Sequence, residues 1–392
     1  MRRALLVFLI LFLVQCSIPV QAGELNIAAQ GAVLMDRETG RVLYAHNPHI
    51  PLPPASTTKI MTILLGLELG QPEEIVTISR LAEYQEGSRV YLGEGEEYTL
   101  QELLYATQLS SANDAAVAVA EHLAGSVEDF AQLMNQRARE LGAKNTNFVN
   151  PNGLPDPEHR TSAYDLALIT RQALQYPEYR ELITTSSYPM SWPGREEDRQ
   201  LRNCNKLFHL YEGADGVKTG YTTEAGHTFV GSATREGRQL ISVVLGSDNN
   251  HVWSDTIALL DYGFENFTNE RLLAPGEEVA QAEVKYGSTV PLVLAEGFTY
   301  SLAVGESEEI TTEVELEESI VAPIKEEEPL GVLRVYFGGE KLAEIPLLAA
   351  EGVKRKIYTR WWFWPLAFYV PWRTWVGIRR LQRHRRRRVW RA

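Results

Sequence analysis

Cysteine is scarce in this chain, which has two, Cys16 and Cys204, among 392 residues. Cys16 lies inside a predicted export signal, so Cys204 alone would remain in the mature protein. An exported chain with a single cysteine has no internal disulfide, and its stability must come from its hydrophobic core. We therefore expect the Cys204 thiol to be a small buried apolar group.

Other absences narrow the chemistry. No glycine-rich phosphate loop is present. His46 and His49 are a pair that could suggest a metal site, but Pro48 breaks the helix that such a pair would need, and no further histidine or carboxylate clusters around them. The sequence therefore predicts neither a metal nor another cofactor.

The body of the chain lacks positive charge. The formal net charge is −13, yet residues 354–392 contain thirteen Lys or Arg and no acid, which leaves −26 for the rest. A body of that sign repels phosphates, so we do not expect a nucleic-acid partner. An acidic body with a basic end indicates two different environments.

The first 22 residues have the pattern of a secretory signal. Arg2 and Arg3 precede the apolar run 4–14, and Val20-Gln21-Ala22 is a small-x-small cleavage site. The alternative is an uncleaved anchor helix, although the run is shorter than the roughly 20 residues that a span needs. We expect an exported protein that begins near residue 23.

The C-terminal residues 353–392 are rich in aromatic and basic side chains, and six of the eight tryptophans lie here. Such enrichment is typical of a membrane interface. The stretch 361–378 has one charge, Arg373, and is just long enough to cross the hydrocarbon. Pro365 and Pro371 would kink it, which favours lying in the interface, and the arginines of 379–388 suit either arrangement. Three arrangements of the tail remain open: a spanning anchor, an interfacial anchor, and an apolar strand followed by a solvated tail.

Residues 24–270 mix helix and strand patterns. A helical pattern over 99–125 begins with a capping box of Thr99 and Glu102, and a second helix over 127–142 follows. Residues 227–246 read as two strands joined by a turn at 235–237. From about residue 272 to 347, six short alternating runs separated by turn residues predict a small all-β module, most simply a sandwich.

A serine and a lysine stand three residues apart in "PASTTKIMT", Ser56 and Lys59, at the predicted start of an apolar helix. At this spacing the two side chains share one face. Ser56 would lie at the positive end of the helix, where a hydroxyl can act as a nucleophile, and Lys59 could serve as its base if its pKa is lowered. Taken alone, the pair is better explained by a capping serine and a solvated lysine.

Two later stretches add polar groups of the same kind. "SSAN" supplies Ser111 and Asn113 between helical segments, and "KTG" supplies Lys218, Thr219 and Gly220 before a strand. A lysine and a hydroxyl on a strand edge suit a carboxylate, and the glycine lets backbone approach closely. Each stretch alone has an ordinary structural explanation, as a helix linker or as a basic edge strand.

In this order, Ser-x-x-Lys, Ser-x-Asn and Lys-Thr-Gly resemble the motif set of the serine-type D-alanyl-D-alanine carboxypeptidases among the low-molecular-mass penicillin-binding proteins. The likeness extends over about residues 28–350 through further family-like segments: "AVLMDRETGRVLYAHNP" (32–48), "PASTTKIMT" (54–62), "NPNGLPDPEH" (150–159) and "DGVKTGYT" (215–222). It implies an α+β fold: a β-lactamase/transpeptidase-like domain with an antiparallel sheet flanked by helices (23–270), a β-sandwich domain (271–352) and a C-terminal membrane anchor (353–392).

The resemblance also implies catalytic roles. Ser56 resembles the acylated nucleophile and Lys59 its general base. Ser111 resembles the group that relays protons, and Asn113 the amide that holds either the substrate or Lys59. Lys218 and Thr219 resemble the groups that receive the terminal carboxylate of the substrate.

The implied reaction removes the terminal D-alanine from peptidoglycan stem peptides. The oxyanion hole would comprise the backbone N–H groups of Ser56 and Tyr221, which follows Gly220. β-Lactams would trap Ser56 as a slowly hydrolysed acyl-enzyme. The protein would work on the outer face of the cytoplasmic membrane, with its tail bound to lipid.

Two departures from the family pattern are visible. Ala112 stands where glycine is common, and Asn203-Cys204-Asn205 stands where Asn-Thr-Asn is usual. Three alternatives remain: a class A β-lactamase, an endopeptidase with the same residues, and a non-catalytic wall-binding or scaffold protein. The first would need a Glu-x-x-x-Asn pattern between Asn113 and Lys218, where none occurs.

Overall fold

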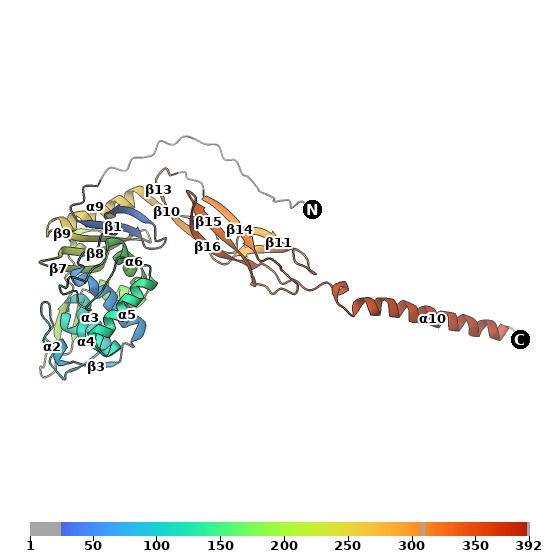
Figure 1. Ribbon diagram of the computed structural model, residues 1–392, viewed down its shortest axis with the longest axis horizontal. Coiled ribbons are helices and arrows are strands. Elements are labelled where there is room, and N and C mark those ends of the chain that lie inside the picture. The colour runs from blue at the N-terminus through green and yellow to red at the C-terminus, as the bar shows by residue number, and fades with distance from the viewer. Residues whose placement is uncertain (1–24, 307–309, 390–392) are drawn as a thin grey trace. The chain divides into compact units, whose positions relative to one another are not determined.

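The computed structural model describes residues 25–306 and 310–389 (Figure 1). The predicted signal peptide, residues 1–22, lies outside the described residues. The chain divides into two compact units. The first runs to Asn269 and also includes Tyr300–Gly305, which the sequence had placed in the β module, and the second comprises the remaining described residues.

The first unit is built on a five-stranded sheet in which every neighbouring pair of strands is antiparallel. The predicted pair of strands around the turn at 235–237 is present as β8 (Gly226–Arg235) and β9 (Arg238–Ser247). Glu236 and Gly237 have the positive φ values of a tight hairpin turn. In spatial order the strands are β2 (Val42–His46), β1 (Gly31–Asp36), β9 (Arg238–Ser247), β8 (Gly226–Arg235) and β7 (Ala214–Thr222). Because β7 is an edge strand, the Lys-Thr-Gly sequence on it lies at the border of the sheet.

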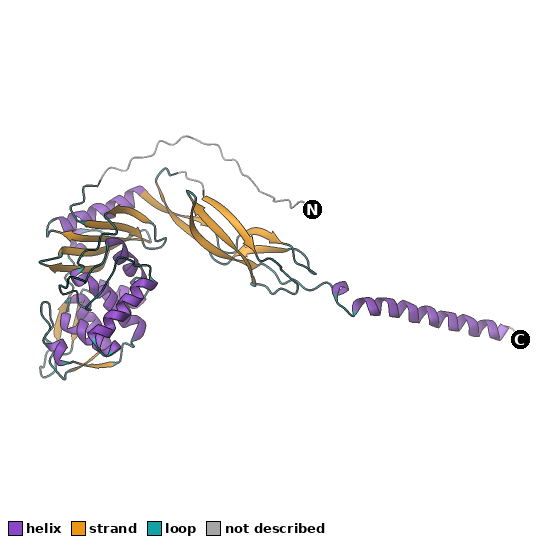
Figure 2. Ribbon diagram, viewed as in Figure 1, coloured by secondary structure: helices purple, strands orange, loops and turns teal. Residues whose placement is uncertain are grey.

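Helices cover both faces of this sheet (Figure 2). Along β9, Ile241 and Val243 join the core on the side of α1 and α6, whereas Leu240 and Val244 join the core beneath α9. This alternation follows from the two-residue period of a strand, and both sides of β9 are apolar because both are covered. The covering helices are α1 (Lys59–Leu69), α6 (Ala163–Ala173) and α9 (His251–Asn266).

The helix α1 is mostly apolar, and its first two turns lie inside the unit. It packs against α3 (Leu100–Leu109), α4 (Asn113–Ala124) and α6, and its residues from Lys59 to Gly66 are buried. A short 3₁₀ turn, η1 (Ala55–Thr58), precedes it and packs against β7 and β8. Burial on all sides fixes the direction in which the first turn of α1 points.

The remaining helices form one side of the unit. The predicted capping box of Thr99 and Glu102 starts α3 (Leu100–Leu109), and the chain then breaks at Ser110–Ala112 before α4 (Asn113–Ala124). The predicted second helix is α5 (Val127–Glu140). The smaller elements are α2 (Arg80–Glu83), α7 (Pro177–Thr184), α8 (Leu207–Leu210) and the ribbons β3 (Ile75–Thr77) with β4 (Glu97–Thr99) and β5 (Ser187–Met190) with β6 (Arg199–Arg202).

All six short runs predicted in the β module form strands. Five lie in one antiparallel sheet with the order β11 (Glu278–Ala282), β12 (Val290–Leu294), β16 (Glu340–Ala349), β15 (Pro329–Phe337) and β14 (Ile310–Leu316). The sixth, β13 (Phe298–Ala303), pairs instead with β10 (Phe267–Leu273).

The described residues therefore show a C-terminal β domain, but not the predicted sandwich of two comparable sheets. Its core contains Ile320, Ala322 and Ile324, which belong to the largely irregular segment between β14 and β15. Apolar residues on such a segment can cover the face of a sheet without forming a second one.

The C-terminal tail is helical, as α10 (Phe363–Val389), and it is preceded by a 3₁₀ turn, η2 (Ile357–Thr359). Pro371 lies inside α10. Within the described part of the chain, no helix combines the length and the hydropathy needed to span a bilayer.

Candidate active site

Hydrogen bonds to the Pro54 carbonyl hold the start of α1 and position Ser56. The carbonyl oxygen of Pro54 accepts hydrogen bonds from the Thr57 hydroxyl at 2.6 Å and from the Thr228 hydroxyl on β8 at 2.9 Å. Ala55 has a φ of +49°, which is uncommon for a residue with a side chain. This strained residue and the bond from β8 fix Ser56 between the sheet and the helices.

The Lys59 side chain is fully buried, and its amine contacts three oxygen atoms. Its Nζ lies 3.1 Å from Ser56 Oγ, 2.7 Å from Asn113 Oδ1 and 2.6 Å from the carbonyl oxygen of Asn152. Burial lowers the pKa of Lys59 well below its usual value, the charge of Lys218 lowers it further, and Asp114 acts in the opposite direction. The lysine is therefore a desolvated amine that faces the serine.

Ser111 contacts the second lysine of the cluster, Lys218. Its Oγ accepts a hydrogen bond from Lys218 Nζ at 3.0 Å, and Lys218 also donates to the Thr219 carbonyl at 3.1 Å. Ser111 has a φ of +55° at the break between α3 and α4, which turns its side chain out of the helical path. Burial lowers the pKa of Lys218 to about 8.

Asn113 and Asp114, at the start of α4, hold one wall of the site. Asn113 Oδ1 contacts Lys59, its Nδ2 donates to the carbonyl of Glu86 at 2.5 Å, and its backbone N–H donates to the carbonyl of Ser88 at 2.7 Å. The buried Asp114 carboxylate accepts from the N–H of Val90 at 3.1 Å. Of the two partners considered for Asn113, the amide therefore meets the lysine.

The edge strand β7 brings its backbone against Ser56. Lys218 and Gly220 are buried, whereas the Tyr221 side chain is 60% exposed and lies on His227 with ring centres 4.6 Å apart. A Cβ atom on Gly220 would lie 2.9 Å from the Ser56 nitrogen. A glycine is therefore needed here for β7 to approach the start of α1.

Cys204 is exposed, so the expectation of a buried thiol is wrong. Asn203 turns inward and donates to the carbonyls of Ile183 and Thr185, and Asn205 caps the N–H of Leu207. The residue between these two asparagines points outward. Burial is the main cause of the lowered pKa of Lys218, and an electrostatic interaction with Cys204 opposes it, which places Cys204 near this lysine.

Several groups in the site were not predicted. The carbonyl of Asn152 contacts Lys59, and Gly153 allows this loop to approach, because a Cβ there would lie 1.9 Å from the carbonyl oxygen of Ala55. The family-like segment "NPNG" contains both residues, so the signal was present without a role attached to it. Among the described residues, no group of three or more His, Cys, Asp or Glu could hold a metal ion.

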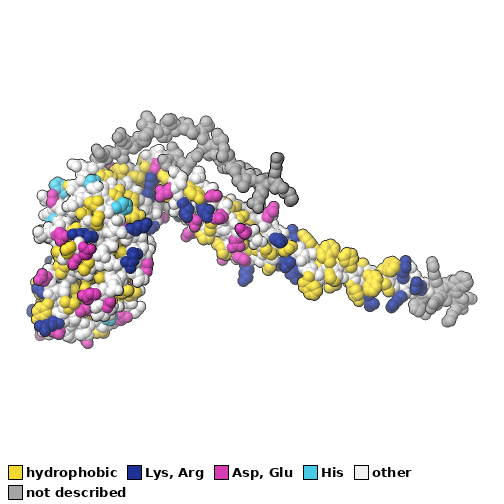
Figure 3. Space-filling view, in the orientation of Figure 1, with side chains coloured by type: hydrophobic (Ala, Val, Ile, Leu, Met, Phe, Trp, Pro, Cys, Tyr) yellow, Lys and Arg dark blue, Asp and Glu magenta, His cyan; other side chains and the backbone are white. Residues whose placement is uncertain are grey.

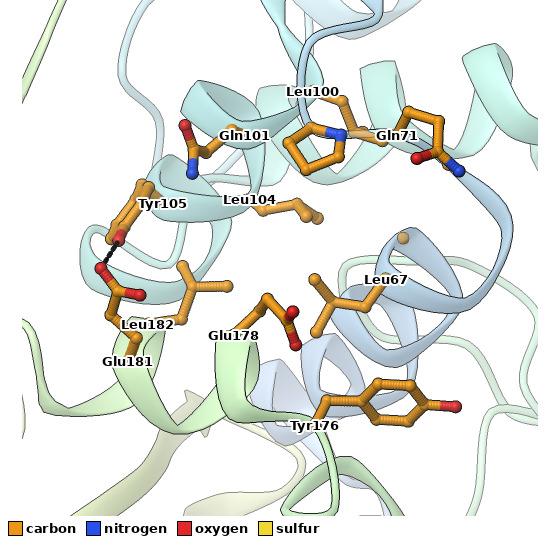
Figure 4. Close-up of a pocket in the computed structure, with 13 residues that line it drawn as sticks. Leu67, Gln71, Leu100, Gln101, Leu104, Tyr105, Tyr176, Glu178, Glu181 and Leu182 are labelled. Carbon is orange, nitrogen blue, oxygen red and sulfur yellow. Dashed lines mark hydrogen bonds between the residues drawn. The ribbon is translucent and has the colours of Figure 1, made fainter.

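A separate cavity of about 360 Å³ lies at the far end of α1, between α1, α3 and α7 (Figure 4). Leu67, Leu104 and Leu182 line it together with Glu178 and Glu181. Its lining contains none of the eight site residues predicted from the sequence. The chemistry of the motifs is therefore concentrated at the N-terminal end of α1.

Comparison with known proteins identifies this arrangement. The profile of the D-alanyl-D-alanine carboxypeptidase family matches residues 18–249, more than half of the chain, and that of the C-terminal domain of penicillin-binding protein 5 matches residues 267–355.

Curated relatives match over most of their length. The chain is 37% identical over 351 residues to the D-alanyl-D-alanine carboxypeptidase DacF of Bacillus subtilis, covering 86% of this chain and 88% of the relative. It is 31% identical over 376 residues to DacD of Escherichia coli, covering 90% and 96%. Penicillin-binding protein 5 from Haemophilus influenzae superposes with a TM-score of 0.71 at 30% identity, over 85% of this chain and 99% of that one.

Proposed function

The chain belongs to the D-alanyl-D-alanine carboxypeptidase family and is a serine-type D-Ala-D-Ala carboxypeptidase of peptidoglycan metabolism, and from this premise we propose how its own residues perform the reaction. Ser56 is the nucleophile and Lys59 is its base. The observation that carries this assignment is the buried Lys59 Nζ at 3.1 Å from Ser56 Oγ.

The hydrogen bonds of Lys59 support its role as a base. A neutral amine has two N–H groups, and the two shorter contacts, to Asn113 Oδ1 and the Asn152 carbonyl, account for both. The lone pair is then directed at Ser56, whose hydroxyl can give it a proton. The lowered pKa of Lys59 makes this neutral form more accessible than it is in an ordinary solvated lysine.

In acylation, Ser56 Oγ attacks the carbonyl carbon of the penultimate D-alanine while its proton passes to Lys59. The backbone N–H groups of Ser56 and Tyr221 receive the oxyanion, and the closeness of Gly220 to the Ser56 nitrogen supports this pairing. When the peptide bond breaks, the amine of the leaving D-alanine takes the proton that Ser56 gave to Lys59, and in this proposal Ser111 relays that proton.

Lys218 and Thr219 receive the terminal carboxylate of the stem peptide. The Lys218 ammonium donates to Ser111 Oγ, so carboxylate binding and proton relay share one hydrogen-bonded chain. Water then hydrolyses the ester on Ser56, with Lys59 as base, and the shortened stem peptide is released. A β-lactam would occupy the same serine as a long-lived acyl-enzyme.

Two measurements test this assignment. Fluorescent penicillin should label the wild-type protein and should not label Ser56→Ala, and a pentapeptide stem should release free D-alanine only with the wild type. Labelling of Ser56→Ala would contradict the assignment of the nucleophile. Labelling of the wild type without release of D-alanine would favour the alternative of a non-catalytic wall-binding protein.

The same proposal places the protein on a membrane. Export through the N-terminal signal would bring it to the outer face of the cytoplasmic membrane, and α10 would bind lipid from there. Trp361, Trp364, Phe368 and Trp372 are each more than half exposed, and Figure 3 shows hydrophobic and basic side chains together along this helix. Aromatic side chains suit the headgroup level, and each arginine near an anionic surface adds about 1 kcal/mol.

An interfacial anchor is therefore the arrangement that these side chains support. Protein ending after Gly352 should lose binding to vesicles that contain anionic lipid, whereas the full chain should bind them and be released by high salt. Equal binding of both proteins would contradict the anchor. Resistance of the full chain to salt and alkaline extraction would favour a spanning tail.

A further inference from the structure

A histidine outside the three motifs is built into the support of Lys59. His159 lies in the loop before α6, and only 2% of its surface is exposed. Its Nδ1 lies 2.9 Å from the backbone nitrogen of Val149, and its Nε2 lies 2.8 Å from the Thr58 hydroxyl. The ring therefore bridges the loop after Phe148 and the residue just before Lys59.

The hydrogen bonds determine the form of this ring. A backbone N–H can only donate, so Nδ1 is the acceptor for Val149, and the neutral ring has its proton on Nε2, which donates to Thr58. Burial lowers the pKa of His159 to about 4, and Arg160 and Lys59 lower it while Asp156 raises it. Above about pH 5 the ring is therefore neutral in a single tautomer.

The loop that His159 holds is the one that contacts Lys59. Three residues after Val149, the carbonyl of Asn152 accepts from Lys59 Nζ, and the carbonyl of Pro151 accepts from the Thr62 hydroxyl at 2.5 Å. The Val149 end of the loop is thus fixed by the histidine and its other end by α1. Displacement of this loop would admit water to Lys59 and free one of its N–H groups.

We propose that His159 is a positioning residue for the catalytic amine: it joins Val149 to Thr58 and so keeps the Asn152 carbonyl against Lys59. The lysine is thereby kept dry, with its lone pair directed at Ser56. This inference rests on the proposed role of Lys59 as the base. His159 itself does not exchange protons with the substrate, because both of its ring nitrogens are occupied by Val149 and Thr58.

Substitutions at both ends of the bridge test the proposal in the full-length protein. In His159→Asn the amide oxygen can replace Nδ1 as acceptor but the Thr58 contact is lost, and in His159→Gln the amide can reach Thr58 but the Val149 contact is lost. Thr58→Val cuts the same bridge from the other side, and Thr58→Ser keeps it. His209→Asn is the matched control, because this histidine is exposed on α8.

The assay measures the second-order rate constant for acylation by fluorescent penicillin from pH 5 to 10. The rate is normalised to the amount of protein that is labelled at the end point, so that unfolded protein does not count. The two His159 variants and Thr58→Val should acylate roughly 10- to 100-fold more slowly. The acid limb of their pH–rate profile for acylation should move to higher pH, because hydration returns the pKa of Lys59 toward its usual value. The KM of these variants for a D-Ala-D-Ala peptide should stay near that of the wild type. Thr58→Ser and His209→Asn should match the wild type in acylation rate, in the acid limb and in KM.

The proposal is overturned if the bridge variants melt at a lower temperature but keep the wild-type acylation rate and acid limb, since His159 would then only stabilise the fold. A rise in KM with an unchanged acylation rate would also overturn it. Lys59→Met separates this failure from failure of the proposed function. If Lys59→Met kept the acid limb of the wild type, Lys59 would not be the base, whatever the His159 variants show.

Discussion

Gly220→Ala should damage catalysis far more than the small size of the change suggests. A Cβ atom at this position would lie 2.4 Å from Thr228 Oγ1 and 2.9 Å from the Ser56 backbone nitrogen. Ordinary contacts begin near 3.4 Å, so the neighbours of the new methyl group must move by roughly 0.5–1 Å. The Thr228 side chain can move by rotation, but the Ser56 nitrogen can move only with the start of α1.

The two displacements have different costs. Overpacking of this kind destabilises a folded protein by about 1–3 kcal/mol. Moving the Ser56 N–H away from the oxyanion removes one donor, which typically lowers kcat by about 10²- to 10³-fold, or about 3–4 kcal/mol of transition-state stabilisation. The loss of rate should therefore exceed what the loss of stability explains.

A double variant separates these effects. Thr228→Ala removes the side-chain clash and leaves the clash with Ser56, so Gly220→Ala/Thr228→Ala should regain part of the melting temperature of Gly220→Ala without regaining its acylation rate. Thr228→Ala alone is the control, because it loses the hydrogen bond to Pro54. Acylation of Gly220→Ala within threefold of the wild-type rate would refute the idea that this glycine aligns the oxyanion site.

Three further predictions follow from other parts of the chain. The KM for a D-Ala-D-Ala substrate should rise above about pH 8, because the buried Lys218 ammonium, with its pKa lowered to about 8, then loses the charge that receives the carboxylate; a KM that stays flat to pH 9.5 would contradict this. A bulky maleimide should label the exposed Cys204 rapidly and inhibit the enzyme, and prior acylation of Ser56 should slow the labelling, whereas Cys204→Ser should be insensitive to the reagent. Arg238→Met should lower the free energy of unfolding by about 3 kcal/mol in chemical denaturation, because the fully buried Asp36 carboxylate, 2.9 Å from the Arg238 guanidinium, would lose its counter-charge.

Local patterns in the sequence predicted individual elements well. The capping box at Thr99 and Glu102, the turn at 235–237 and the six alternating runs of the β module each depend on neighbours within a few residues. Such signals survive in any tertiary context that does not oppose them. The resemblance drawn from the three motifs is confirmed, because family profiles and curated relatives match the same parts of the chain.

Two expectations failed because they depended on distant contacts. Cys204 was expected inside the core, yet the inward hydrogen bonds of Asn203 and Asn205 turn it outward. The β module was expected to be a sandwich, but an irregular segment with Ile320 and Ile324 covers its sheet. Composition alone does not distinguish these outcomes, because burial depends on what packs against each residue.

Within the active site too, the sequence predicted which residues take part but not which of them contact one another. Sequence order and motif spacing singled out Ser56, Lys59 and Lys218, but they did not indicate which hydroxyl faces which amine. The structure places Ser111 on Lys218 and puts the Asn152 carbonyl against Lys59. These partners come from segments about 100 residues apart in the chain, so no local pattern relates them.

The sequence by itself therefore determined the family, the elements and the set of polar residues available for chemistry, because helical and strand periods and short motifs are local properties. Only the tertiary structure decided that the lysine of "PASTTKIMT" is a dry amine. Its pKa falls because α1 is buried on every side and because β7 brings a second ammonium close to it. Desolvation and the Coulomb interaction depend on distance in space, and the fold alone sets that distance.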